Sequence, residues 1–129
     1  MRLLLDTHVM LWLAVSPAKL SEATLERVRD ARQDLLMSTV SAWEISIKYA
    51  NGKLPLASAP AEFVPELQRR LKLSVLPIEL THAIRAGALP PLHRDPFDRM
   101  LVAQAMTHGL PIVTVDPRIA AYGVEVIRG

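Results

Sequence analysis

The sequence contains no cysteine among its 129 residues. That absence excludes a disulfide framework and a thiolate metal site, and it favours a cytoplasmic protein. No apolar run approaches the roughly 18 residues that would cross a bilayer, so we expect no membrane partner. A strong excess of charge is also missing. The formal net charge is +2 and the pI is about 9.3. So small a positive charge does not by itself indicate that the protein binds nucleic acid.

Hydrophobic residues, in contrast, make up 50% of the chain, and the mean hydropathy is +0.22. The length is enough for one domain with a substantial core. No repeat, linker or low-complexity segment divides the sequence, so we predict a single domain over residues 1–129. The high hydropathy predicts an exposed apolar patch that serves self-association or a partner.

Short apolar segments alternate with amphipathic ones along the chain. We predict strands at residues 2–5, 34–39, 74–79, 111–115 and 124–127, and helices at 10–14, 21–32, 38–53, 59–73, 80–89 and 95–108. Pro65 predicts a kink or a restart in its helix. The strands are apolar throughout, which is typical of a mainly parallel sheet covered on both faces, so we expect an α/β fold.

Two of the predicted strands end in an aspartate, Asp6 after the first and Asp116 after a late one. Either residue alone could be a turn aspartate that accepts hydrogen bonds from backbone amides two residues on. Ligands of parallel sheets, however, bind beyond the carboxyl ends of the strands. We therefore expect the two carboxylates to converge there.

The stretch HRDPFDRM places two aspartates at the start of an apolar helix. In a structural interpretation, Asp95 is the N-cap, Pro96 the first helical residue and Asp98 the acid of a capping arrangement. The chemical interpretation rests on helical phase, because Asp98 shares its face with apolar residues at Leu101, Val102, Ala105 and Met106. A capping acid usually points to solvent, whereas Asp98 lies at the edge of this buried stripe. Asp95 caps the helix under either interpretation.

Glu44 has two interpretations as well. With Lys48 four residues later it forms a favourably oriented surface pair. Its neighbours Val40, Trp43 and Ile47, however, make this an otherwise apolar stretch of helix.

If the four acids meet, their repulsion has to be relieved. Two carboxylates ~4 Å apart repel by about 4 kcal/mol at an effective dielectric constant of 20. Either some of them are protonated or a divalent cation lies among them. Ligation by carboxylate oxygens suits Mg²⁺ or Mn²⁺ rather than zinc, and it points to hydrolysis of phosphate esters.

Four segments of the chain resemble the PIN-domain family in order and spacing, and they look most like VapC-type toxins of bacterial toxin–antitoxin pairs: LLLDTHVMLWL, STVSAWEISIKYANGKL, RDPFDRMLVAQA and IVTVD. The similarity runs essentially from end to end. It implies a three-layer α/β/α sandwich with a mainly parallel central sheet. It also implies an acidic pocket that holds Mg²⁺ or Mn²⁺, and endoribonuclease cleavage of RNA phosphodiester bonds by a metal-activated water.

The resemblance assigns the family's acids, as metal ligands and catalytic residues, to Asp6, Glu44, Asp98 and Asp116. Thr114 matches a small hydroxyl residue that often supports the site in relatives, and Thr7, next to Asp6, is a second supporting candidate. The implied partners are an RNA substrate, a cognate antitoxin that lies over the active-site groove, and a second copy of the chain in a homodimer.

Other polar and aromatic residues allow two roles each. Arg94, Arg99 and Lys48 could contact RNA phosphates or could be solvated side chains. We expect Trp43 to pack in the core rather than to stack on a base. The four histidines show no pairing at metal-ligand spacing, and we expect none of them to bind zinc.

Rival classes fit the sequence less well. A phosphotransfer receiver needs an acid pair after the first strand and a lysine after a late one, whereas Asp6 stands alone and VDPRIAAYG contains no lysine. A phosphatase with an aspartyl nucleophile needs Asp-x-Asp, but the chain has Thr7 and His8 after Asp6. A non-catalytic PIN-like interaction module and other metal-dependent phosphoesterases remain the alternatives, and the intact set of acids argues against the former.

Overall fold

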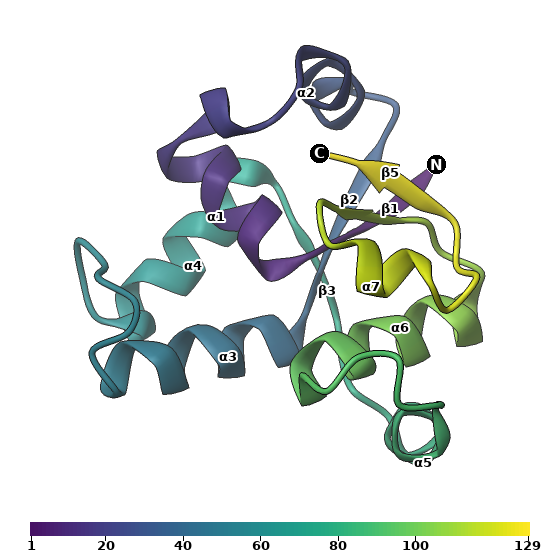
Figure 1. Cartoon of the computed structure of the whole chain (residues 1–129). Helices are drawn as coiled ribbons and strands as arrows, with labels where there is room; N and C mark the ends of the chain where they lie inside the picture. The colour runs from purple at the N-terminus through teal and green to yellow at the C-terminus, as the bar shows by residue number, and fades with distance from the viewer.

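Five strands form one sheet in the computed structural model of the chain, which describes residues 1–129. In the order in which they lie side by side, they are β3 (Ser74–Leu76), β2 (Asp34–Ser38), β1 (Arg2–Leu5), β4 (Ile112–Thr114) and β5 (Val126–Arg128). Every neighbouring pair is parallel, with Leu3 opposite Leu35 and Leu5 opposite Val113. The parallel sheet predicted from the apolar strands is confirmed (Figure 1).

Helices occupy the connections between these strands. They are α1 (Thr7–Val15), the 3₁₀ turn η1 (Pro17–Lys19), α2 (Glu22–Arg29), α3 (Thr39–Ala50), α4 (Pro60–Leu71), α5 (Leu80–Ala88), α6 (Pro96–His108) and α7 (Pro117–Ala120). None of the helices combines the length and the apolar character that crossing a bilayer requires.

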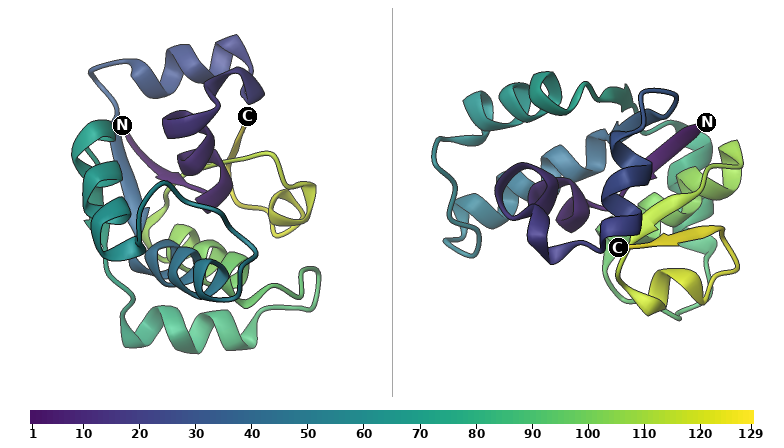
Figure 2. Two further views of the ribbon diagram at one scale, coloured as in Figure 1. Left: turned by 90° about the vertical axis from the view of Figure 1, so that its left-hand side faces the viewer. Right: turned by 90° about the horizontal axis from the view of Figure 1, so that it is seen from above.

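Successive leucines of β1 face opposite sides of the sheet, and each side has its own core. Leu3 and Leu5 pack with side chains of α1, α2, α3 and α4. Leu4 packs on the other face with α6 and α7, and α5 lies against the outside of α6 (Figures 1 and 2). All three leucines of β1 are 0% exposed. Helices therefore cover both faces, which confirms the three-layer α/β/α sandwich.

Several boundaries differ from the predicted ones for local reasons. α1 begins at Thr7 rather than at residue 10, because the Asp6 side chain caps it by accepting a hydrogen bond from the His8 amide. β3 ends before Pro77, which has no amide hydrogen to donate to a ladder. α4 continues through Pro65 without a restart. A short helix, α7, follows Asp116 where none was predicted.

The order of the strands determines where the functional side chains gather. β1 lies between β2 and β4, so the carboxyl ends of these three strands are adjacent. Asp6 follows β1, Asp116 lies just beyond β4, and α3, which carries Glu44, starts directly after β2. The amino end of α6 brings Asp98 to the same edge of the sheet, where its charge acts on those of the other three acids.

Candidate active site

Asp6 lies at the centre of this edge and is only 3% exposed. Its Oδ2 accepts a hydrogen bond of 2.6 Å from the Thr114 hydroxyl, and its Oδ1 accepts one of 3.3 Å from the His8 amide. Burial raises the pKa of Asp6, although the Thr114 and His8 contacts oppose the rise. The carboxyl group is thus held firmly in a place that disfavours its charge.

Glu44 is also buried, at 2% exposure, on the inner face of α3. Its Oε2 forms an ion pair with Lys48, as the surface-pair interpretation predicted, but the glutamate itself is not on the surface. Its Oε1 has no hydrogen-bond partner. A buried carboxylate oxygen without a partner costs free energy, unless a cation or another donor reaches it.

The structure shows which of the two aspartates at the start of α6 caps the helix. Asp95 is the N-cap of α6, because its Oδ1 accepts from the amides of Phe97 (2.8 Å) and Asp98 (3.3 Å). The Asp98 side chain takes no part in that cap and is only 14% exposed. Burial first, and then the negative charges of the acids around it, raise the pKa of Asp98 to about 8; the acids are Asp6, Asp95, Glu44 and Asp116.

Asp116 caps α7 and has more cationic support than the other acids. Its Oδ1 accepts from the Arg118 amide (2.9 Å) and from Arg118 Nε (3.1 Å), while its Oδ2 lies 3.1 Å from Arg118 Nη2. Burial alone would raise its pKa, but the bonds from Arg118 and from His93 outweigh burial and lower the pKa of Asp116.

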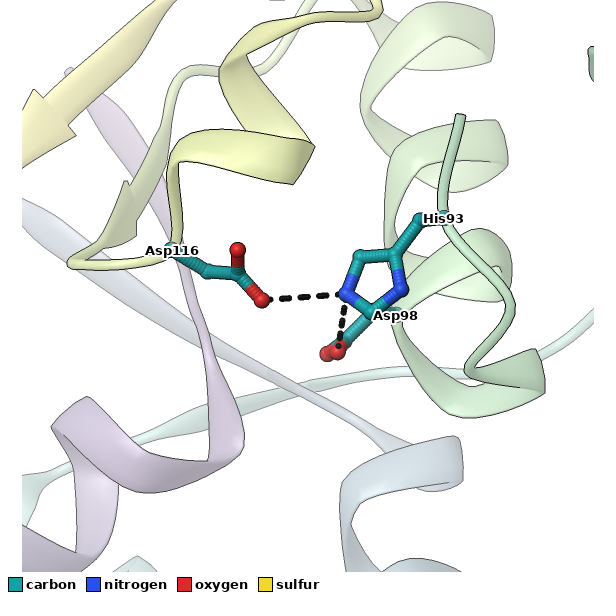
Figure 3. Close-up of side chains that lie close together, drawn as sticks. All are labelled: His93, Asp98 and Asp116. Carbon is teal, nitrogen blue, oxygen red and sulfur yellow. Dashed lines mark hydrogen bonds and ion pairs between the residues drawn. The ribbon is translucent and has the colours of Figure 1, made fainter. Parts of the chain in front are cut away.

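His93 joins two of the acids (Figure 3). Its Nε2 lies 2.9 Å from Asp98 Oδ2 and 3.0 Å from Asp116 Oδ2. A ligand atom from each of these three side chains lies within 4.8 Å of the other two. The structure therefore places Asp98 and Asp116 in one cluster with His93, and the charges of Asp6 and Glu44 also act on Asp98.

The sequence matches the PIN domain family over residues 3–125, which is nearly the whole chain. The chain belongs to the PIN-domain family. A 61-residue stretch, 47% of this PIN domain and 43% of the relative, is 44% identical to Ribonuclease VapC16 of Mycobacterium tuberculosis. Ribonuclease VapC22 of the same organism is 29% identical over 120 residues, which cover 92% of this chain and 90% of that one.

Solved structures share the fold of this PIN domain. VapBC2 from Rickettsia felis, determined with a DNA fragment from its promoter, matches with a TM-score of 0.73 at 13% sequence identity. The match covers 99% of this chain and 98% of that chain. At so low an identity the likeness supports the fold alone.

The two supporting residues lie beside the acids of this PIN domain. Thr114 bonds to Asp6 and also accepts a hydrogen bond of 3.0 Å from the Asp116 amide, so it links two of the acids. The Thr7 hydroxyl donates over 2.8 Å to Ser41 Oγ and so ties α1 to α3. Both threonines are buried.

The three basic residues named as possible RNA contacts have different surroundings. Arg94 is exposed. Lys48 is paired with Glu44, and although burial opposes it, this bond and the nearby acids raise the pKa of Lys48. Arg99 instead holds the chain together, because its guanidinium donates to carbonyl oxygens at Ala86, Leu89, Pro90 and His93. Its hydrogen-bonding capacity is therefore used inside the protein.

One expectation needs correction. Trp43 does not pack in the core: it is 60% exposed and meets Phe97 edge-on, with ring centroids 5.4 Å apart. That the histidines bind no zinc stays a prediction, but the fold gives them close contacts that the sequence did not indicate: His93 with two acids, and His82 with His108 over 2.8 Å between their Nε2 atoms. His93 and Asp116 are 23 positions apart in the sequence, and His82 and His108 are 26 positions apart. Local spacing could therefore not indicate these two contacts.

Proposed function

We propose that this protein is a Mg²⁺- or Mn²⁺-dependent endoribonuclease that acts as the toxin of a toxin–antitoxin pair. The observation that supports the proposal is that Asp98 lies in a cluster with Asp116 and His93, where the charges of Asp6 and Glu44 also raise its pKa, while one buried oxygen of Glu44 has no partner. The ribonuclease names of the relatives support it, and so do the similar structures from Klebsiella pneumoniae and Mycobacterium tuberculosis that are described as toxin–antitoxin systems.

The residues fit a hard divalent cation. Lys48 and Arg118 each pair with one acid, so two of the four carboxylates have no lysine or arginine as a counter-ion when all are ionised. The unpartnered Oε1 of Glu44 and the raised pKa of Asp98 both indicate missing positive charge. The donors are carboxylate oxygens, which Mg²⁺ and Mn²⁺ accept as ligands.

In this proposal, Asp6, Glu44, Asp98 and Asp116 would hold the cation. Bound there, the cation would polarise a phosphoryl oxygen and lower the pKa of a water molecule that attacks the phosphorus. The Thr114 hydroxyl holds Asp6 in position, and Lys48 holds Glu44. In the cation-free protein at neutral pH, Asp98 keeps a proton, which relieves part of the repulsion in the pocket.

The proposed substrate and partners are argued from exposed basic and apolar side chains. Arg94, Lys48 and the 64%-exposed Arg118 are the side chains that we propose contact RNA phosphates. We propose a cognate antitoxin and a second copy of the chain as protein partners, and the cytoplasm as the location. Large exposed apolar side chains, among them Leu80 (76%) and Ile84 (65%) on α5, are available for such contacts.

RNA cleavage by the purified protein tests the proposal. We expect single-stranded RNA to be cut with Mn²⁺ and to stay intact with EDTA, and Asp98→Asn and Asp6→Asn to abolish cutting while they keep the fold. Glu26→Gln, an exposed acid on α2, removes the same charge outside the site and serves as the matched control. Cleavage by Asp98→Asn at the rate of the parent would reject the proposal. Cation binding without any cleavage would point instead to a non-catalytic module.

A further inference from the structure

His93 lies in a loop that the rest of the protein holds rigidly. The residue is 3% exposed and belongs to the segment between α5 and α6. Arg99 donates to the carbonyl oxygens of Pro90 and His93. The Tyr122 hydroxyl donates to Pro90 over 2.7 Å and accepts from the His93 amide over 3.0 Å. This support leaves the imidazole little freedom to turn away.

A backbone amide determines which nitrogen of the ring carries the proton. The Asp95 amide donates to His93 Nδ1 over 3.2 Å, so Nδ1 offers a lone pair and has no hydrogen. The proton of the ring is therefore on Nε2. That nitrogen donates to Asp116 Oδ2 over 3.0 Å and also lies 2.9 Å from Asp98 Oδ2, so one N–H group contacts carboxylates from two different elements.

We propose that His93 is a positioning residue of the acidic site and not a ligand of its cation, an inference that rests on the proposed function. A ligand would need the lone pair of Nε2, which would move the proton to Nδ1 and set two N–H groups against each other at Asp95. As a donor to Asp116 that also contacts Asp98, His93 instead keeps the two carboxylates at a fixed separation. Because Oδ2 is the oxygen of Asp98 that faces His93, its Oδ1 atom stays available to a cation.

Such preorganisation predicts a measurable effect on cation affinity. Hydrogen-bond partners of metal ligands typically change affinity by about 10–100-fold when they are removed. We expect His93→Leu, which cannot donate, to weaken Mn²⁺ binding by about tenfold or more. His93→Gln extends an amide N–H toward the same two oxygens, so its affinity is expected within about threefold of the parent.

Two measurements on the full chain test this role. The first follows free Mn²⁺ by electron paramagnetic resonance with the parent, His93→Gln and His93→Leu, after circular dichroism has established that each is folded. Equal affinities of parent and His93→Leu would overturn the positioning role. The second records ¹⁵N–¹H spectra of the histidine-labelled parent, so it needs no variant. We expect the His93 proton on Nε2 both without a cation and at saturating Mg²⁺.

The outcomes separate this inference from the function on which it rests. A proton on Nδ1 in the cation-free protein would show that the hydrogen-bond assignment of His93 is wrong, whatever the protein cleaves. Loss of the Nε2 proton only when Mg²⁺ binds would make His93 a ligand and would leave the nuclease proposal intact. A parent protein that binds neither cation would overturn both.

Discussion

Thr114 donates its hydroxyl hydrogen to Asp6 over 2.6 Å, although the two residues are 108 positions apart in the sequence. The same oxygen accepts the Asp116 amide at 3.0 Å. One side chain at the end of β4 therefore holds the carboxylate of Asp6 and the backbone of Asp116, two acids that follow neighbouring strands. This contact explains why a hydroxyl residue is useful at a position that is otherwise completely buried.

Replacement of Thr114 tests that relationship. Thr114→Val keeps the shape but removes both hydrogen bonds, so we expect weaker Mn²⁺ binding and a loss of about 1–3 kcal/mol in the free energy of unfolding. Thr114→Ser keeps the hydroxyl and should bind Mn²⁺ like the parent. Calorimetric titration and urea unfolding measure the two effects. Equal Mn²⁺ affinities for the valine and serine variants would contradict this role.

Lys48 neutralises Glu44 in the cation-free protein, and its removal should therefore act in two directions. Lys48→Met leaves a buried carboxylate without its partner, which should lower the free energy of unfolding by about 1.5 kcal/mol. It also removes a positive charge that repels the cation, so the rise in Tm that Mn²⁺ produces should be larger than in the parent. Differential scanning fluorimetry with and without Mn²⁺ measures both, and Lys53→Met, at an exposed position, is the control. A smaller Mn²⁺-dependent rise in Lys48→Met would argue that Lys48 assists the cation.

Arg99 is expected to matter for the fold rather than for RNA charge. Arg99→Lys keeps the charge but loses most of the bonds to the loop before α6, so it should lower the free energy of unfolding by about 2–3 kcal/mol. Arg94→Lys, at an exposed position, should leave the free energy of unfolding unchanged. Urea denaturation compares the two variants. Full stability of Arg99→Lys would show that these hydrogen bonds contribute little.

The raised pKa of Asp98 predicts an unusual dependence of stability on pH. The folded pKa is about 8 and the ordinary value is 3.8, so between these values the folded protein holds a proton that the unfolded chain lacks. In EDTA, the free energy of unfolding should rise as the pH falls from about 8 toward 4, by up to ~1.4 kcal/mol per pH unit.

The control for this prediction is Asp98→Asn, which removes the titrating group and leaves the others in place. The difference in the free energy of unfolding between parent and variant should change steadily between about pH 5 and pH 8. A difference that does not vary over this range would mean that Asp98 titrates normally, and that the acids do not crowd as the structure places them.

The sequence was sufficient for the features that depend on burial and strand order. Uniformly apolar strands predicted a parallel sheet with two covered faces, and the aspartates after the first and fourth strands predicted the edge where Asp6 and Asp116 lie. The phase of α6 predicted that Asp98 faces inward while Asp95 caps. In each case a local pattern carried the information.

The features that the sequence did not reveal depend on contacts between distant segments. His93 gains its role from Asp116 on another element and from a loop conformation that Arg99 and Tyr122 maintain. Trp43 was expected in the core, but hydrophobicity alone does not indicate which side of α3 faces the sheet. The adjacent Glu44 takes the buried position instead.

The central claim is that the carboxylates of Asp6, Glu44, Asp98 and Asp116 together form one cation site. A crystal structure with Mn²⁺, with diffraction data collected to locate the ion by its anomalous scattering, tests this claim most directly. The account predicts an anomalous peak among these oxygens, with His93 still bonded to Asp116 and still in contact with Asp98. Crystals that bind Mn²⁺ elsewhere, or show no peak between the acids at saturating Mn²⁺, would contradict it.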